Sequence, residues 1–444
     1  MEAVILAVGT ELLGSDRLDT NSLVLTAALE ARGWRLARKC AVADDLRSIS
    51  LELARAAEDA DLILVSGGLG PTRDDLTREA VAAFAQRRLV LDRTVLETIE
   101  QRYRSFGHVM PETNRKQAEV IEGARVLPNP AGTAPGLHLN VETAGARRVD
   151  LFLFPGVPRE LWVLTREALE PWLDAHEGSL PRRRQLELKV ACLPESLVEE
   201  RIAPVYDMLG HDQVSVLASP GDIRIRLRPP AAAGDAGDAA DATDQALGNA
   251  LDRAVEAVRA GVGDALYSER GEDLEKVVLD LLVANERSLS VAESCTGGLV
   301  AERLTAIPGS SAAFVGGGIV YSNALKSTML GVDEAAIESH GAVSREVAIA
   351  MARGAVRRFG SDLAIAVTGV AGPGGGSDEK PVGTVHLALA TSDGAHWLGV
   401  RFPGDRERIR RQASQLALEM VRRRLLGLPV ESYWQSSAPG EAER

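Results

Sequence analysis

The segment LILVSGGLGPTRDD, residues 62–75, passes from an apolar run directly into a glycine-rich loop. Residues 62–65 are all apolar, which is typical of a strand covered on both faces of a parallel sheet. In doubly wound α/β sheets, the loops that follow the strands form the ligand crevice. Glycines in such a loop let backbone N–H groups approach an anion closely. The segment therefore predicts an α/β fold with an anion-binding loop after this strand.

Short apolar runs alternate with amphipathic stretches on either side of this segment. Residues 3–8 and 149–154 are predicted to be further buried strands, and residues 21–32 carry helical spacing. Strands that alternate with helices favour a largely parallel sheet with helices on its faces. We therefore predict a doubly wound α/β domain over residues 1–170.

The composition changes after residue 170, and the remaining chain divides into three parts. Residues 171–262 have the pattern of a small α+β connector module. Inside it, residues 231–244 (AAAGDAGDAADATD) carry almost only Ala, Gly and Asp, so we expect a solvated, mobile insertion. Residues 273–428 predict a second doubly wound α/β domain, and residues 429–444 a polar tail.

The pattern after residue 170 also predicts individual elements, with Ser344 as a helix N-cap. The expected strands are residues 186–190, 214–218, 223–227, 288–291, 314–320, 363–367 and 384–391. The expected helices are residues 195–209, 246–260, 274–284, 345–358 and 406–426.

The composition excludes some classes of function. The 444 residues include 63 acidic and 50 basic side chains, a formal net charge of −13, and only 4% aromatic residues. An acidic chain with few aromatic side chains is a poor partner for nucleic acid. Cys40, Cys192 and Cys295 lie far apart without a CxxC pair, which fits a reducing compartment. We find neither a secretion signal nor an apolar run of about 20 residues, so we expect a cytoplasmic protein without a membrane partner.

Two further glycine loops occur in the N-terminal part, GTELL after residues 3–8 and NPAGTAPG at residues 129–136. Neither the loops nor the segment at residues 66–75 match GxxxxGK[ST] or GxGxxG, which disfavours a P-loop or dinucleotide site. Asp74 and Asp75 lie where a phosphate site would need positive charge. A bridging divalent cation would explain them, and enrichment of acids in a first helical turn is the structural alternative.

In the C-terminal part, ESCTGG at residues 293–298 follows a predicted strand and precedes a helix. A small nucleophile at such a turn lies beside backbone donors that can stabilise an oxyanion. Cys295 and Ser294 compete for this role. Cys295 lacks a nearby histidine in sequence, and Ser294 needs a base that Lys326 can supply if its amine is neutral. The structural alternative is that Ser294 caps the helix and Lys326 lies on the surface.

Two other C-terminal features allow two interpretations each. The glycine-rich residues 368–376 form either a second phosphate-sized loop or a hairpin lid. Arg408 either holds an anion or belongs to a solvated face, since an arginine in the first helical turn opposes the helix dipole.

The N-terminal motifs GTELL, DTN, GGLGPTRDD, NRKQA, NPAGTAPG and PGVP resemble the N-terminal domain of the CinA family. Residues 14–19 depart from the family pattern. The resemblance implies a MogA/MoeA-like, molybdopterin-binding-like fold that hydrolyses ADP-ribose to AMP and ribose 5-phosphate. It also implies a divalent metal (Mg, Mn or Co) and, in some members, K+. On this resemblance the metal ligands are Glu11, Asp74 and Asp75, and the phosphate is bound by Gly67, Gly68, Gly70, Thr72, Gly132 and Thr133.

The C-terminal motifs ESCTGG, YSNxxK, GAVS, TGxAGP, PVGTV and GDRExxR are similar to the C-terminal domain of the same family. This resemblance implies a nicotinamide-nucleotide amidase that converts nicotinamide mononucleotide (NMN) to nicotinic acid mononucleotide and ammonia without a metal. It makes Ser294 the nucleophile, Lys326 the base and Tyr321 a proton relay. The implied substrate contacts are Thr368, Arg408 and the amides of Gly297 and Gly298, the last two as oxyanion donors.

Together these expectations describe a bifunctional enzyme of pyridine-nucleotide recycling, with NMN and ADP-ribose as its small-molecule partners. The alternative is that the N-terminal domain binds a pterin or nucleotide without turnover and the protein is a competence-associated scaffold. We expect a homodimer, because small α/β domains commonly form twofold-symmetric dimers.

Overall fold

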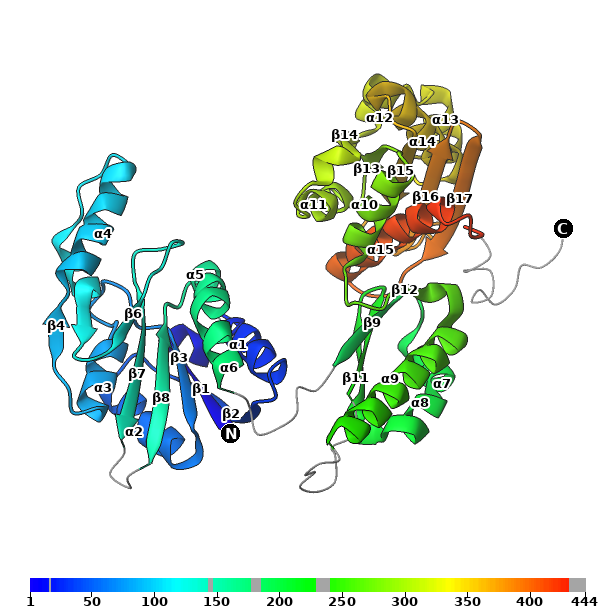
Figure 1. The fold of residues 1–444 in the computed structure, drawn as a ribbon. Coiled ribbons are helices and arrows are strands. Elements are labelled where there is room, and N and C mark those ends of the chain that lie inside the picture. The colour runs from blue at the N-terminus through cyan, green and yellow to red at the C-terminus, as the bar shows by residue number, and fades with distance from the viewer. Residues whose placement is uncertain (16, 143–146, 177–184, 229–239, 431–444) are drawn as a thin grey trace. The chain divides into compact units, whose positions relative to one another are not determined.

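The computed structural model describes residues 1–15, 17–142, 147–176, 185–228 and 240–430 (Figure 1). The chain forms two compact units, Met1–Arg184 and Gln185–Arg444, and each is described by itself. The predicted tail at residues 429–444 lies outside the described residues from residue 431 onward.

The first unit is built on a six-stranded sheet with the strand order β2-β1-β3-β8-β7-β6. The four strands β2, β1, β3 and β8 run parallel, and β7 and β6 continue the sheet in antiparallel register. The strands are β1 (Glu2–Val8), β2 (Arg35–Val42), β3 (Leu62–Ser66), β6 (Arg125–Leu127), β7 (Gly136–Glu142) and β8 (Arg148–Phe154), with β4 (Leu89–Leu91) and β5 (Glu119–Ile121) as a separate pair.

Helices cover both faces of this sheet, each over its own apolar cluster. On one face lie α1 (Asn21–Glu30), α5 (Pro158–Leu164) and α6 (Glu170–Ala175); on the other lie α2 (Leu46–Asp59), α3 (Thr77–Phe84) and α4 (Arg93–Ser105). The two faces alternate along β1, because Ile5 faces one cluster and Leu6 the other. The predicted doubly wound fold is confirmed for this unit, although β2, β7 and α2 were not among the predicted elements.

The second unit begins with an antiparallel sheet of order β10-β11-β9-β12. Its elements are β9 (Leu186–Ala191), α7 (Glu195–Arg201), α8 (Ala203–Leu209), β10 (Val214–Ser219), β11 (Asp222–Leu227), α9 (Ala240–Val262) and β12 (Leu266–Ser268). The helix predicted over residues 195–209 is interrupted at Ile202, since Pro204 lacks an N–H and its ring would clash inside a helix. Helix α9 begins at Ala240, so the end of the predicted insertion is helical; residues 231–239 of it lie outside the described residues.

The rest of this unit is a five-stranded sheet of order β14-β13-β15-β16-β17. Strands β13, β14 and β15 are parallel, and β16 and β17 follow as an antiparallel pair. The strands are β13 (Leu289–Glu293), β14 (Phe314–Ile319), β15 (Leu363–Gly369), β16 (Thr384–Thr391) and β17 (Gly394–Arg401). Strand β17 was not predicted.

Helices again cover both faces, which confirms the predicted doubly wound architecture of this part. On one face lie α10 (Leu274–Ala284), α11 (Leu299–Thr305) and α15 (Arg406–Leu425); on the other lie α12 (Asn323–Leu330), α13 (Glu334–His340) and α14 (Arg345–Phe359). Ser344 caps α14 as predicted, since its hydroxyl accepts a hydrogen bond from the Val347 amide.

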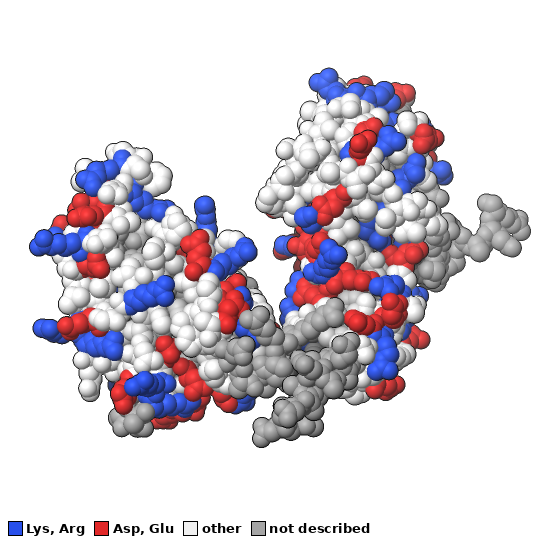
Figure 2. All heavy atoms as spheres, in the orientation of Figure 1, with Lys and Arg blue, Asp and Glu red and all other residues white. Residues whose placement is uncertain are grey.

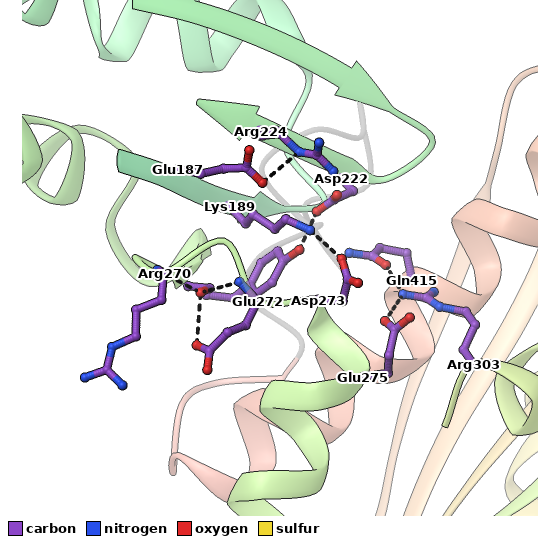
Figure 3. A network of polar contacts seen from close by, with 12 residues as sticks. Glu187, Lys189, Asp222, Arg224, Arg270, Glu272, Asp273, Glu275, Arg303 and Gln415 are labelled. Atoms are coloured by element: carbon purple, nitrogen blue, oxygen red, sulfur yellow. Dashed lines mark hydrogen bonds and ion pairs between the residues drawn. The ribbon is translucent and has the colours of Figure 1, made fainter. Parts of the chain in front are cut away.

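The antiparallel sheet and the five-stranded domain share a core and a polar network (Figure 3). Ala191, Cys192 and Tyr267 belong to the apolar cluster under α10 and α15. Beside them, buried Lys189 pairs with Asp273, and Arg303 donates to Glu275 and Gln415. The connector is therefore packed onto the C-terminal domain rather than tethered to it.

The described surface carries mixed charge. On the face shown in Figure 2, basic and acidic side chains are interspersed over both units. Among the described residues, no helix combines the length and the apolar character that crossing a bilayer requires.

Candidate active site

The predicted nucleophile loop, residues 294–298, follows β13, which lies between β14 and β15 in the five-stranded sheet. Because β13, β14 and β15 are parallel, the segments that follow all three strands meet at one sheet edge. The Ser294 amide donates to the Val367 carbonyl at the end of β15, with an N···O distance of 2.9 Å. Gly297 and Gly298 have φ values of +62° and +96°, which only glycine adopts readily, and they turn the chain into α11.

Lys326 approaches Ser294 from α12, the helix that Ser322 caps. Its Nζ lies 3.3 Å from Ser294 Oγ and within hydrogen-bond distance of two carbonyl oxygens, Val320 at 2.9 Å and Tyr321 at 3.2 Å. The lysine is only 1% exposed, and among the described residues no carboxylate pairs with it. Burial lowers the pKa of Lys326 below its ordinary value, which favours the neutral amine.

Cys295, the competing nucleophile, lies in apolar surroundings. Its side chain is buried in the cluster under α10 and α15, and burial raises the pKa of its thiol to about 12. A thiol with so high a pKa holds almost no thiolate at neutral pH. The environment therefore favours Ser294, and it excludes the alternative that Lys326 is an ordinary surface lysine.

The carboxylate of Glu293 accepts hydrogen bonds from three backbone amides, one of which, that of Gly298, the sequence suggested as an oxyanion donor. Glu293 Oε2 accepts from the amides of Gly298 at 2.9 Å and Val300 at 3.2 Å, and Oε1 accepts from Ala301 at 2.8 Å. The Gly297 amide donates to the Ser294 carbonyl at 3.1 Å. Both amides are therefore hydrogen-bonded within the protein in this conformation, and their role as oxyanion donors stays a prediction.

Two other amides in the same loop are available. Within the described residues, no acceptor is found for the backbone N–H groups of Cys295 and Thr296. The amide of the residue after a nucleophilic serine is a common oxyanion donor at strand-to-helix turns. These two groups are the donors that the loop can offer to a developing negative charge.

The first turns of α15 supply the positive charge. Leu299, Arg406, Glu407, Arg410 and Arg411 line a cavity of about 350 Å³. Arg410 donates through two nitrogens to the Thr296 carbonyl, at 3.1 and 2.6 Å, which joins the cavity to the nucleophile loop. Arg408 does not line this cavity, and its role as a substrate contact stays a prediction. Arg410, four residues after Arg406, lies on the same helix face as Arg406.

In the structure, Tyr321 and Thr368 make hydrogen bonds that the prediction did not include. The Tyr321 ring is 59% exposed; its hydroxyl accepts from Arg406 at 3.2 Å, and its carbonyl oxygen accepts from Lys326. Thr368 is buried, and its hydroxyl donates to the Ala342 carbonyl at 2.8 Å. Thus the backbone carbonyl of Tyr321 binds Lys326. The Thr368 side chain links the end of β15 to the loop before α14.

In the first unit, four of the predicted site residues line three separate hollows. Glu11 lines a small one with Asp19, Asn21 and Gly156, at the carboxyl ends of β1 and β3, and lies 3.8 Å from Arg17. Thr72 lines a second of about 460 Å³, together with Arg73, Arg115 and Lys116. Gly132 and Thr133 line a third of about 490 Å³ beside α4.

The three glycines of the loop after β3 have packing roles. Gly67 has a φ of +100°, and a Cβ there would lie 2.1 Å from the Val8 carbonyl oxygen of β1. A Cβ on Gly68 would meet Thr77, and one on Gly70 would meet Asp75. The buried Arg78 donates to the carbonyls of Leu69 and Gly70 at 2.7 and 2.9 Å. The loop is therefore held rigidly, with two of its carbonyl groups turned inward.

The predicted metal ligands do not form one ligand set. Asp75 accepts from the amide and the hydroxyl of Thr72, at 2.8 and 2.6 Å, so that one of its oxygens is occupied. Hydrogen bonding to Thr72 lowers the pKa of Asp74. Across the residues that the structure describes, no three His, Cys, Asp or Glu side chains cluster as a metal site would require. The residues Glu11, Asp74 and Asp75 therefore do not fit a shared divalent cation in this structure.

Glu293, Arg406 and Arg410 lie in the motifs ESCTGG and GDRExxR, but no role was predicted for them from the sequence. A signal for Glu293 was present, because alternation along β13 places it on the same buried face as Leu289 and Val291. A carboxylate on such a face must find donors. The arginines are spaced by four residues at the start of a predicted helix, which places both on one face.

Comparisons with known proteins match two separate parts of the chain. A sequence model described as "CinA C-terminal domain" matches residues 271–425, and one described as "Probable molybdopterin binding domain" matches residues 4–175. A CinA-like protein of Acidobacterium capsulatum is 43% identical over 96% of this chain and 100% of its own length. A CinA-like protein of Solibacter usitatus is 41% identical over 96% and 99%. The solved structure of competence/damage inducible protein CihA from Agrobacterium tumefaciens is 45% identical, covering 33% of this chain and 91% of its own, with a TM-score of 0.33.

Proposed function

The chain belongs to the CinA family along nearly its whole length, and on this premise we propose that its C-terminal domain hydrolyses the amide of nicotinamide mononucleotide. The products are nicotinic acid mononucleotide and ammonia. The observation that carries the proposal is the contact between Ser294 Oγ and Lys326 Nζ, at 3.3 Å, in surroundings that exclude most water.

The hydrogen bonds around Lys326 suit a neutral amine. A neutral primary amine has two N–H donors and one lone pair. The carbonyls of Val320 and Tyr321 can take the two N–H groups, which leaves the lone pair for the Ser294 hydroxyl. Lys326 then accepts the serine proton as Ser294 Oγ attacks the amide carbon, as a general base activates a nucleophile.

The rest of the reaction follows from the same two side chains. The protonated Lys326 gives its proton to the departing nitrogen, so that the C–N bond breaks and ammonia leaves. The acyl group remains on Ser294 Oγ as an ester. Water, deprotonated by the neutral lysine, then attacks this ester. As the bond from the acyl carbon to Ser294 Oγ breaks, the protonated lysine returns the proton to Oγ, which releases the carboxylic acid and restores the serine and the neutral amine. The amides of Cys295 and Thr296 stabilise the oxyanion in both steps, a contribution commonly worth about 10²–10³-fold per donor.

The arginines of α15 account for the nucleotide half of the substrate. A 5′-phosphate carries charge that guanidinium groups recognise well, often through two hydrogen bonds. Arg406 and Arg411 line the cavity beside the nucleophile loop. We therefore assign the phosphate to this cavity, in place of Arg408.

Ammonia release from NMN tests the proposal. The purified chain should release ammonia, Ser294→Ala should abolish release, and Cys295→Ala should retain activity because its thiol is buried and protonated. Unchanged release by Ser294→Ala would exclude the serine mechanism. No release by the wild type would exclude the NMN assignment.

For the N-terminal domain we propose a binding site for a phosphorylated nucleotide. Arg73, Arg115 and Lys116 line the same hollow as Thr72, next to the loop that follows β3. The family resemblance suggests ADP-ribose as the substrate, cleaved to AMP and ribose 5-phosphate with a divalent metal and, in some members, K+. Because the predicted carboxylates do not form a ligand set, we derive no metal-dependent step from them.

ADP-ribose distinguishes catalysis from binding in this domain. Incubation with and without Mg²⁺, Mn²⁺ or Co²⁺, followed by chromatography, shows whether AMP forms. Binding by calorimetry without AMP formation would favour the non-catalytic module and the scaffold role. If ADP-ribose is neither bound nor cleaved, it is excluded as the ligand.

A further inference from the structure

Glu293 is a buried acidic side chain directly beside the candidate nucleophile. It is the last residue of β13 and is 1% exposed. Among the described residues it takes part in no ion pair with a lysine or arginine. Three backbone N–H groups take the place of such a cation, those of Gly298, Val300 and Ala301. Burying a carboxylate is costly unless it is fully hydrogen-bonded, so this arrangement needs an explanation.

The three hydrogen bonds close a ring around the nucleophile loop. They join the residue before Ser294 to the residues after Gly297, so that the loop of residues 294–297 is spanned by one side chain. The Gly297 amide and Arg410 hold the loop from within and from α15. The loop therefore depends on Glu293 at its base for its conformation.

Lys326, the general base, is positioned by a different set of hydrogen bonds. The Glu293 main-chain carbonyl accepts from the Val320 amide at 2.8 Å, and the Val320 carbonyl in turn accepts from Lys326. A change of the Glu293 side chain leaves this backbone chain in place. The side chain thus bears on the position of Ser294 and not on that of Lys326.

We propose that Glu293 is a positioning residue: its carboxylate fixes the loop that carries Ser294, so that Oγ faces the lysine and the free amides of Cys295 and Thr296. The kinetic part of this inference rests on the proposed amidase function. The structural part, that the carboxylate orders residues 294–301, does not.

Glu293→Gln is the informative substitution. Glutamine has the same shape, but one of its two terminal atoms is an N–H₂ donor that would face a backbone donor. We expect kcat for NMN to fall about 10- to 100-fold, since small misplacements of reacting groups cost up to about 10²-fold. KM should change less than about threefold and the midpoint of the pH–rate profile should not move, because substrate contacts and Lys326 are unchanged.

Hydrogen–deuterium exchange tests the same proposal without a substrate. In Glu293→Gln the amides of Gly298, Val300 and Ala301 should exchange faster, whereas exchange around Lys326 should stay as in the wild type. If the glutamine variant does not fold, Glu293→Asp, which keeps both acceptor oxygens on a shorter side chain, should show faster exchange than wild type at the same amides.

Glu419→Gln is the matched control, since Glu419 in α15 is also 1% exposed but binds Arg422 instead of the loop. It should lower thermal stability without a selective fall in kcat. The proposal is overturned if Glu293→Gln keeps kcat and amide exchange within about twofold of wild type. It is also overturned if both variants lose stability, kcat and KM in the same way. If wild type releases no ammonia, the NMN function fails and the exchange comparison alone decides the proposal.

Discussion

Lys326 shows how burial lowers the pKa of a lysine side chain below its ordinary value. Burial removes water from the amine of Lys326. Two carbonyl oxygens orient the amine, but they carry no formal negative charge that would stabilise its protonated form. The lysine was predicted from the motif, but the lowering of its pKa depends on burial by residues distant in sequence. The role of Arg410 was missed for a similar reason, since its target, the Thr296 carbonyl, lies 114 residues away.

The pH dependence of NMN hydrolysis follows from Lys326. Its pKa is lowered by burial, so below that pKa the lysine is protonated and cannot accept the serine proton. We expect kcat/KM to be lost as pH falls through a midpoint below the ordinary lysine value of about 10.4. Lys326→Met should lower kcat about 10²–10⁴-fold, the usual range for a general base. Lys276→Met, on the exposed face of α10, should leave the profile unchanged; a pH-independent wild-type rate would contradict the assignment.

Arg410 and Arg408 form a matched pair two residues apart on α15. Arg410→Ala removes two charge-assisted hydrogen bonds to the nucleophile loop, and such bonds contribute about 1.5–3 kcal/mol each. We expect kcat/KM for NMN to fall at least about 10-fold. Arg408→Ala should stay within about twofold of wild type. Steady-state kinetics on both variants check the prediction, which the reverse order of effects would contradict.

Among the elements, α14 shows where sequence pattern and structure diverge. Its N-cap and length were predictable because Ser344 and the apolar spacing are local signals. The role of Gly354 was not, because it depends on α12, which packs against the middle of α14. A Cβ on Gly354 would lie 2.1 Å from the Leu330 carbonyl oxygen. Similarly, β17 was missed because its pairing with β16 decides its conformation more than its own residues do.

Gly354→Ala should therefore destabilise the protein, although glycine to alanine inside a helix usually stabilises by about 0.5–1 kcal/mol. Forcing a methyl group into a close backbone contact costs about 1–3 kcal/mol. Gly248→Ala in α9 is the matched control, since a Cβ added there would meet no atom of the described residues within 4 Å, and it should be stabilising. Urea denaturation of both variants measures the difference. A rise in the midpoint for Gly354→Ala would show that α12 and α14 are less closely packed.

For the whole molecule, the sequence predicted two α/β ends and a small module between them. It did not predict that the module shares a core with the C-terminal domain. Ala191, Cys192 and Tyr267 complete that core from short strands whose contacts lie far along the chain, so no local pattern reports them. The homodimer stays a prediction, which sedimentation of the purified chain would test.

A fragment of residues 185–430 should consequently be more stable than one of residues 271–430. The shorter fragment exposes the surface that the three connector side chains cover, and a fully buried apolar side chain contributes about 1.5–3 kcal/mol. It also removes Lys189 from Asp273. Urea midpoints of the two fragments provide the measurement, and equal midpoints would show that the connector adds nothing to the domain.

The shared core also limits how genes of this family can be recombined. A chimera that joins two relatives near residue 184 exchanges the second unit whole, with its interior intact. A crossover near residue 271, where the matched C-terminal domain begins, would place Lys189 and Tyr267 from one parent against Asp273 and α15 from the other. The natural unit of exchange is thus longer than the region that carries the proposed chemistry, and functional hybrids should be concentrated at the earlier junction.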